Sequence, residues 1–248
     1  MIDSVLIIGQ SNMAGRGFVN DVPEINDERI KMLRNGRWQT MFRPVCPDRR
    51  TSGVCLAESF AKRYIEDHDG VEIGIIPCAD GGTSVTQWAE GGLLYDNTVF
   101  QATLAKRTSN IVAVLWHQGE ADCSPERYPL YRDRALAIFE ALRRDLDLGE
   151  VPFIVGGLGD FLPLREISPN LKNYMKLNEQ LLRIAELPGY AFASAEGLSA
   201  NEDNLHFSAA ALLEFGERYY EVFKRMEKER SSTEKKLDDS NRSEMELL

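Results

Sequence analysis

Short continuous apolar runs alternate along this chain with stretches of helical periodicity, and this alternation constrains the fold more than any other feature. The runs lack polar alternation, which is typical of strands covered on both faces. Between and after them, apolar residues recur every three or four positions, which predicts helices. The pattern therefore indicates an α/β fold with a parallel sheet. The five predicted strands span residues 5–8, 72–76, 111–116, 153–155 and 190–193.

The domain organisation follows from a change of composition near the C-terminus. The chain has 248 residues, without an internal repeat or a composition break before about residue 223, so one domain over 1–223 is predicted. Residues 224–248 hold fourteen charged side chains, seven of each sign, and no aromatic, Gly or Pro. The start of this segment is expected to extend the last helix. The rest is expected to be a solvated tail, partly disordered, because it has little apolar surface to bury.

Charge and composition exclude several classes of partner. The net charge of −10 predicts binding neither to nucleic acid nor to an anionic membrane. No apolar run approaches the roughly 18 residues of a membrane span. The first residues lack the basic region of a signal peptide, so a cytoplasmic location is expected. Four irregularly spaced cysteines and three histidines predict neither a disulfide framework nor a metal site, and no cofactor is expected. The sequence leaves the oligomeric state open.

Glycines and polar residues gather where the predicted strands end. In open α/β sheets, ligands bind outside the carboxyl ends of the strands. The segments after the first four strands are 9–17, 78–84, 117–120 and 156–161, and residues 201–207 precede the last helix. We therefore expect the functional site to be built from these five segments.

Within them, a serine, a histidine and an aspartate have the types and spacing of a nucleophile relay. Ser11 follows the first strand, where Gly9 permits a tight turn into a helix whose free N–H groups would face developing negative charge. Asp203 precedes His206 by three residues, so both side chains can face the same way, and Asp203 would orient the imidazole toward Ser11. The alternatives are that Ser11 and Asp203 only cap helices. Glu202 is a rival orienting group that would point elsewhere.

Two further groups could donate hydrogen bonds to an oxyanion. Gly82 could present a backbone N–H, and Gln118 its side-chain amide. Losing one such donor typically costs about 3–4 kcal/mol of transition-state stabilisation. The alternatives are an ordinary tight turn for the glycine and a surface polar residue for Gln118.

Five segments together resemble the SGNH hydrolase superfamily, and within it the group of sialate O-acetylesterase-like proteins and acetyl xylan esterases of carbohydrate esterase family six. They are GQSNMAGRG (9–17), GGTSVTQW (81–88), WHQGEAD (116–122), GGLGDF (156–161) and DNLHF (203–207), and the resemblance spans about residues 3–223. It implies a three-layer α/β/α fold with a five-stranded parallel sheet. It also implies Ser11 as nucleophile, His206 as general base and then acid, and Asp203 as orienting group.

The resemblance further implies an oxyanion hole made by the Ser11 N–H, a glycine of the second segment and Gln118, which stands where the wider superfamily has Asn. Gly82 is preferred to Gly81 as the glycine donor. Supporting roles are implied for Gln10, Asn12, Arg16, Gly81 and Glu120, with Glu120 bracing the loops.

The implied function is that of a serine esterase that removes O-acetyl groups from carbohydrates through an acetyl-enzyme. The substrate would be a small acetylated sugar, such as an acetylated xylo-oligosaccharide or O-acetyl sialic acid. Arg16 could meet a substrate carboxylate or pair with a nearby acid. Trp88 and Tyr95 could stack on a sugar ring or anchor their loop.

Three rival interpretations differ in how well they fit the sequence. A nucleotide site lacks both the P-loop lysine and a Gly-x-Gly-x-x-Gly after the strand. An ordinary α/β-hydrolase elbow, Gly-x-Ser-x-Gly, would need glycine where Met13 stands. The alternative that we keep is a carbohydrate-binding protein that has this fold without activity.

Overall fold

A seven-stranded sheet forms the centre of the protein, in the order β3-β2-β4-β1-β5-β6-β7. The computed structural model describes residues 1–245, with side chains through residue 232. Neighbouring strands are parallel except β2 and β3, which are antiparallel. The strands are β1 (Ile2–Gly9), β2 (Ile30–Arg34), β3 (Arg37–Thr40), β4 (Ile73–Pro77), β5 (Ser109–His117), β6 (Phe153–Gly156) and β7 (Tyr190–Ala193).

The predicted α/β class is confirmed, and so are the five predicted strands, but the predicted strand number was too low. The structure adds a hairpin, β2–β3, at one edge of the sheet. Its outer strand, β3, has no buried residue and no continuous apolar run. The apolar pattern therefore did not predict it. The signal for this hairpin is its turn, because Asn35 and Gly36 both have positive φ, at 52° and 74°. That dipeptide favours the tight turn of a two-residue hairpin.

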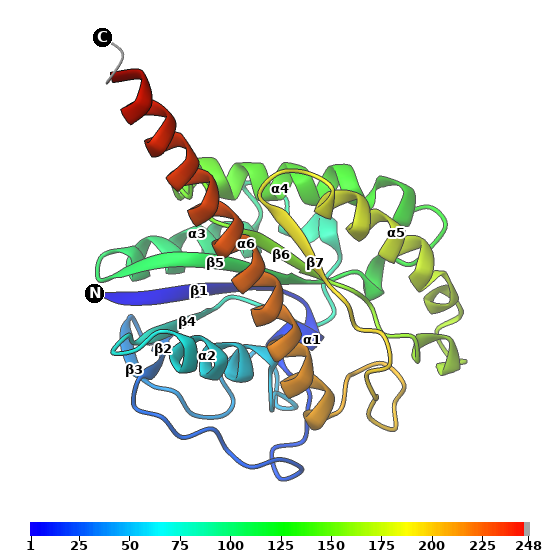
Figure 1. Cartoon of the computed structure of the whole chain (residues 1–248). Helices are drawn as coiled ribbons and strands as arrows, with labels where there is room; N and C mark the ends of the chain where they lie inside the picture. Colours follow the sequence, from blue (N-terminus) through cyan, green and yellow to red (C-terminus); the bar gives the residue numbers. More distant parts are fainter. Residues whose placement is uncertain (246–248) are drawn as a thin grey trace.

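Helices cover both faces of the sheet. Figure 1 shows α3, α4 and α5 on one face and α2 together with α6 on the other, which is the expected three-layer arrangement. The helices are α1 (Ser11–Ala14), α2 (Leu56–Asp67), α3 (Leu93–Lys106), α4 (Tyr131–Asp145), α5 (Tyr174–Ala185) and α6 (Ala209–Met245). Among the described residues, no helix has the length and apolar character that crossing a membrane requires.

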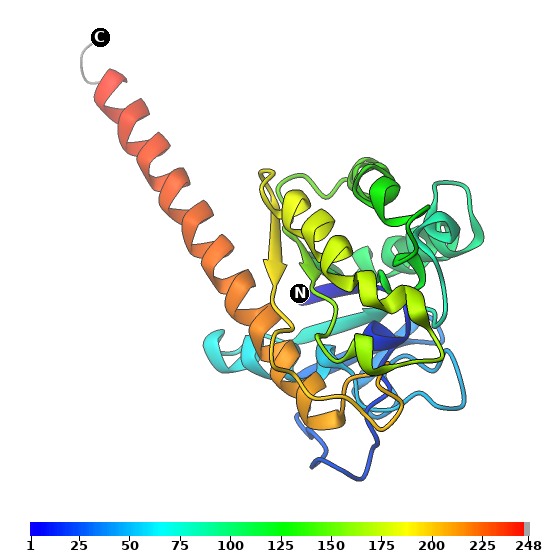
Figure 2. The ribbon, with the colours of Figure 1, turned by 90° about the vertical axis from the view of Figure 1, so that its right-hand side faces the viewer.

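Helix α6 runs from the body of the domain outward past its edge, as Figures 1 and 2 both show. The start of the segment after residue 223 is predicted to extend the last helix, and the helix continues to Met245. The partial disorder expected for the rest of the segment stays a prediction. This segment is rich in Glu, Lys and Arg, which favour helices, and has no Gly or Pro to end one. Residues 246–248 of the predicted tail lie outside the described residues.

The central strand β1 brings the two halves of the site together. Its residues from Ser4 to Gly9 are buried, and Gly9 pairs with His117 at the end of β5. A Cβ at Gly9 would lie 2.1 Å from the His117 carbonyl oxygen, and Gly9 has a φ of 135°. Glycine is therefore required where β1 turns into α1, and this turn places Ser11 at the carboxyl edge of the sheet.

Candidate active site

A cavity of about 690 Å³ opens at the carboxyl edge of the sheet. Its lining combines segments that are far apart in the sequence: the start of α1, the loop after β4, the segment after β5 and the loop before α6. The residues that matter below are Gln10, Ser11, Gly82, Glu120 and His206. Four of the five predicted segments contribute to this lining, whereas residues 156–161 do not, and residues 167–171 line the cavity instead.

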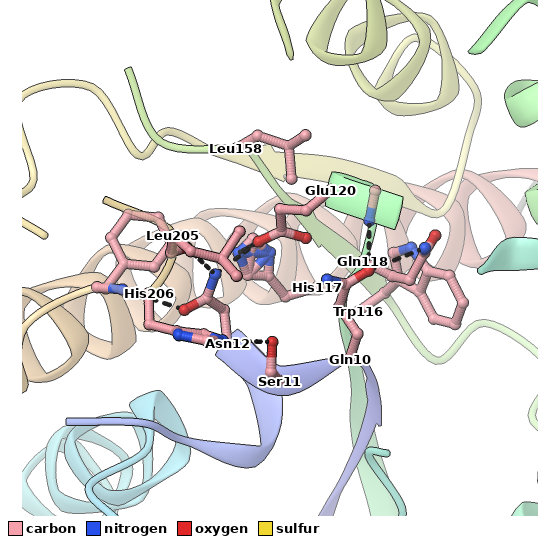
Figure 3. A network of polar contacts seen from close by, with 12 residues as sticks. Gln10, Ser11, Asn12, Trp116, His117, Gln118, Glu120, Leu158, Leu205 and His206 are labelled. Carbon is pink, nitrogen blue, oxygen red and sulfur yellow. Dashed lines mark hydrogen bonds and ion pairs between the residues drawn. The ribbon is translucent and has the colours of Figure 1, made fainter. Parts of the chain in front are cut away.

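Ser11, His206 and Asp203 form a continuous hydrogen-bonded relay. The Ser11 Oγ lies 3.0 Å from His206 Nε2, across 195 positions of sequence. On the other side of the ring, His206 Nδ1 lies 2.6 Å from Asp203 Oδ2. Figure 3 shows Ser11 at the start of its helix with the contact to His206 dashed. The arrangement matches that of a serine nucleophile, its base and the group that orients the base.

The environment of the relay sets the protonation of the histidine. Burial lowers the pKa of His206 below its ordinary 6.5, although the hydrogen bond and charge of Asp203 act in the opposite direction. Burial raises the pKa of Asp203, but the N–H groups of His206 and Leu205 and the His206 ring outweigh it, so this pKa lies below its ordinary value. At neutral pH the aspartate is therefore charged and the imidazole neutral. Its Nδ1–H donates to Asp203, which leaves Nε2 to accept the Ser11 hydroxyl proton.

Asn12 and Glu120 hold the two halves of the relay in place. The Asn12 amide donates to Glu120 Oε1 at 2.6 Å and to the Leu205 carbonyl at 3.2 Å, and its oxygen accepts the Phe207 N–H at 3.1 Å. Burial raises the pKa of Glu120 to about 7, partly offset by the Asn12 hydrogen bond. His117 Nε2 lies 3.8 Å from Glu120 Oε1. Burial alone lowers the pKa of His117 to about 3, so this core histidine is neutral.

The backbone N–H groups beside Ser11 differ in availability. The Ser11 N–H begins α1 and so has no acceptor within the helix. The Gly81 N–H donates to Asp48 Oδ2 at 2.8 Å. The Gly82 N–H has no hydrogen-bond partner among the described residues. Gly82 has a φ of 77°, and the space where a side chain would stand is open. Of the two glycines, Gly82 is therefore the one with a free donor at the cavity.

Comparison with known proteins identifies the family. Residues 2–225 match the family described as carbohydrate esterase, sialic acid-specific acetylesterase. A probable carbohydrate esterase of Arabidopsis thaliana is 30% identical over 240 residues, which cover 85% of this chain and 86% of that protein. The chain belongs to this family of carbohydrate esterases. The family resemblance predicted from the sequence is thereby confirmed.

Solved structures confirm the fold of this carbohydrate esterase. The structure of an Arabidopsis thaliana protein matches with a TM-score of 0.79 at 26% identity, covering 90% of this chain and 98% of that one. The protein NanS matches with a TM-score of 0.73 at 20% identity, covering 92% and 98% of the two chains. A carbohydrate acetylesterase of Xanthomonas citri gives 0.66 at 20% identity, covering 88% of this chain and 54% of that one. The last two likenesses show the fold alone.

Arg16 of the esterase is paired within the protein. Its guanidinium makes two hydrogen bonds to the Asp48 carboxylate, at 3.0 and 2.7 Å, and the two side chains are only 7% and 4% exposed. Burial acts to raise the pKa of Asp48, but the hydrogen bonds from Arg16, Ser52 and the Gly81 N–H bring it below its ordinary value. Of the two alternatives for Arg16, the structure shows the pairing with a nearby acid.

Asp48 is a site residue that the sequence analysis missed. It connects Arg16 to the glycine turn after β4, and thus fixes the loop that carries Gly82. It lies in a loop outside every motif, and its two partners at the site, Arg16 and Gly81, are 32 and 33 positions away. Nothing in the local sequence marks it.

Gln118 does not occupy the place that the sequence analysis gave it. Its side chain is fully buried and is not among the residues that line the cavity. The amide nitrogen donates to Gln10 Oε1 at 3.1 Å, to the Thr83 carbonyl at 3.0 Å and to Asp122 Oδ2 at 2.7 Å. The predicted donation from Gln118 to an oxyanion was wrong for this structure, because its N–H groups already have acceptors.

Trp88 and Tyr95 also face inward. They are 1% and 3% exposed, and their polar atoms bond to Thr83 and Asp145. Trp88 anchors the loop after β4, and Tyr95 connects α3 to α4, so neither ring is available to stack on a sugar. Among the described residues, no group of three or more His, Cys, Asp or Glu side chains has the geometry to hold a metal ion.

Proposed function

We propose that this carbohydrate esterase is a serine enzyme that removes O-acetyl groups from sugars through an acetyl-enzyme intermediate. The observation that carries the proposal is the relay itself: Ser11 Oγ is 3.0 Å from a neutral His206, whose other nitrogen donates to Asp203. The relay borders a cavity of about 690 Å³, within the usual range for small-molecule sites.

In the proposed reaction, the relay residues act once in acetyl-enzyme formation and once in its hydrolysis. Ser11 Oγ attacks the acetyl carbonyl carbon while His206 Nε2 takes the hydroxyl proton, and Asp203 stabilises the resulting imidazolium. The carbonyl oxygen becomes an oxyanion next to the N–H groups of Ser11 and Gly82. The bond to the sugar oxygen then breaks, and His206 returns the proton to that oxygen. Water repeats the sequence on the acetyl-enzyme and releases acetate.

The substrate that we propose is a small O-acetylated sugar, either O-acetyl sialic acid or an acetylated xylo-oligosaccharide. The family description and the names of the similar carbohydrate esterases support this class. Beyond the relay, the cavity lining mixes polar and apolar groups, among them Arg49, Ile167 and Asn170. Such a mixture suits a sugar, which has both hydroxyl groups and apolar ring faces. Acetate release from a panel of both sugar classes and simple acetates distinguishes the candidates.

Removal of the serine hydroxyl tests the mechanism. We expect Ser11→Ala to lose at least about 10³-fold in kcat on a chromogenic acetate ester while its circular dichroism and Tm stay near wild type. A serine-reactive phosphonate should modify wild type at Ser11, identified by mass spectrometry. The control is Ser231→Ala, which removes an exposed serine of α6. Full activity in Ser11→Ala contradicts the mechanism, and sugar binding without turnover or labelling would favour the carbohydrate-binding alternative.

A further inference from the structure

One wall of the cavity comes from a segment outside every predicted motif. Residues 167–171 lie between β6 and α5, and all five line the cavity. Arg165 lies two residues before this wall and is not part of the cavity lining. Its backbone N–H donates to the Leu162 carbonyl at 3.1 Å, and its carbonyl accepts the Ser168 N–H at 3.1 Å. Two backbone hydrogen bonds thus fix Arg165 next to the wall.

The Arg165 side chain connects this wall to the loop that carries the base. Its Nε donates to Ser168 Oγ at 3.3 Å, and its Nη1 donates to the Asp203 carbonyl oxygen at 2.6 Å, across 38 positions of sequence. Hydrogen bonds with an ionised donor are stronger than those between neutral groups. Among the described residues, no carboxylate forms an ion pair with Arg165. The guanidinium therefore binds the Asp203 backbone rather than a counter-charge.

Asp203 depends on this contact, because its other hydrogen bonds stay within its own turn. Its Oδ1 accepts the N–H groups of Leu205 and His206 at 2.9 and 3.0 Å, and its Oδ2 faces His206 Nδ1. In the part of the chain that the structure describes, Arg165 is the only residue outside the 201–207 loop that hydrogen-bonds Asp203. The Asp203 side chain is 39% exposed, so packing alone does not hold it.

We propose that Arg165 is a positioning residue of this esterase, which holds Asp203 from the side of the cavity wall and so keeps its carboxylate aligned with His206. The inference rests on the proposed serine mechanism. Asn12 holds the other end of the same loop from α1. Displacement of a catalytic group by about 1 Å can cost about 10²-fold in rate. Because Arg165 lies outside the cavity lining, its loss should slow turnover more than it weakens substrate binding.

Substitution of Arg165 by methionine and by lysine tests the hydrogen bond. Arg165→Met keeps the unbranched stem but has no donor, whereas Arg165→Lys keeps a charged donor. We expect Arg165→Met to lower kcat on a chromogenic acetate by about 10–100-fold, with KM changed less than about threefold. Arg165→Lys should recover part of this loss, because its ammonium can still donate to the Asp203 carbonyl.

The pH and a matched control separate the hydrogen bond from other effects of the substitution. Burial is the largest cause that lowers the pKa of His206, and the charges of Arg16 and Arg165 act in the same direction, while Asp203 opposes them. Kinetics at about pH 8 therefore keep the ring neutral in each variant. The control is Arg218→Met, because Arg218 also bonds two loop carbonyls, at 3.0 and 2.8 Å, outside the cavity lining. Its kcat should stay near wild type.

A double variant and an exchange measurement test whether Arg165 acts through Asp203. If it does, Arg165→Met has little further effect on kcat in Asp203→Ala. The Leu205 and His206 N–H groups, which donate to Asp203, should also exchange with solvent faster in Arg165→Met. Unchanged kcat or unchanged exchange in Arg165→Met overturns the inference, and so do losses that multiply in the double variant. Absence of Ser11-dependent turnover in wild type would instead overturn the proposed function, and this inference with it.

Discussion

The Asn12 side-chain oxygen accepts the backbone N–H of Phe207 at 3.1 Å, across 195 positions of sequence. One residue thus joins the helix of the nucleophile to the loop of the histidine. Each partner in this bond is the next residue after a member of the relay, because Asn12 follows Ser11 and Phe207 follows His206. The distance between the nucleophile and its base is therefore set by a neighbouring amide as well as by the backbone of the two loops.

We expect Asn12→Ala to lower kcat by about 10–100-fold with little change in KM. Loss of the amide frees the His206 loop from α1, and misplacement of a catalytic group by about 1 Å costs a factor of this size. Steady-state kinetics on a chromogenic acetate measure it. The matched control is Asn178→Ala, since Asn178 also bonds a backbone N–H and carbonyl of one residue, Leu158, outside the cavity lining. Equal losses in both variants would show a general destabilisation instead.

The acidic limb of the pH–rate profile should lie below pH 6.5. The base must be neutral, so kcat/KM is retained above the pKa of free-enzyme His206 and lost as pH falls through it. Burial places that pKa below 6.5, and Asp203 acts to raise it. Asp203→Ala should therefore shift the limb to still lower pH and reduce kcat by about 10⁴-fold. A limb above pH 6.5 in wild type would contradict this account.

Glu120→Gln should change how stability depends on pH. Burial raises the pKa of Glu120 from 4.5 to about 7 in the folded protein, which therefore binds the proton more tightly than the unfolded chain. This group favours folding fully below pH 4.5, and its contribution is lost as pH rises to about 7. The loss amounts to roughly 3 kcal/mol, at about 1.4 kcal/mol for each pKa unit.

Urea unfolding at pH 4.5, 5.75 and 7 measures this effect. His117, with its lowered pKa, changes stability with pH in the opposite direction, so the two proteins are compared at each pH. We expect the free energy of unfolding of wild type relative to Glu120→Gln to fall as pH rises. A difference that stays constant over this range would mean that Glu120 has an ordinary pKa.

Asp48→Ala should destabilise the protein by about 3–5 kcal/mol. It leaves the Arg16 guanidinium nearly buried without its counter-charge, which is the costly way to break a buried pair. The double variant Asp48→Leu, Arg16→Met removes both charges and should recover much of the loss. Chemical denaturation measures both variants. A loss below about 1 kcal/mol in Asp48→Ala would show that solvent reaches Arg16 readily.

The α/β class, five of the seven strands and the place of the site could be predicted from the amino-acid sequence. Continuous apolar runs mark strands buried on both faces, and parallel strands carry their carboxyl ends to one edge. The spacing of Asp203 and His206 is local, so it could be evaluated without coordinates. The juxtaposition of His206 with Ser11 followed from placing both segments at the same edge.

The partners of the remaining polar groups became known only from the folded structure. The choice between Gly81 and Gly82 depends on Asp48, and the partner of Arg16 is the same distant carboxylate. Gln118 does not line the cavity, and its amide nitrogen instead donates to Gln10, Thr83 and Asp122. The burial of apolar side chains produces a periodic pattern in the sequence, which can be recognised without the structure. A hydrogen bond between distant segments depends on the direction of single atoms, and only the folded arrangement sets that direction.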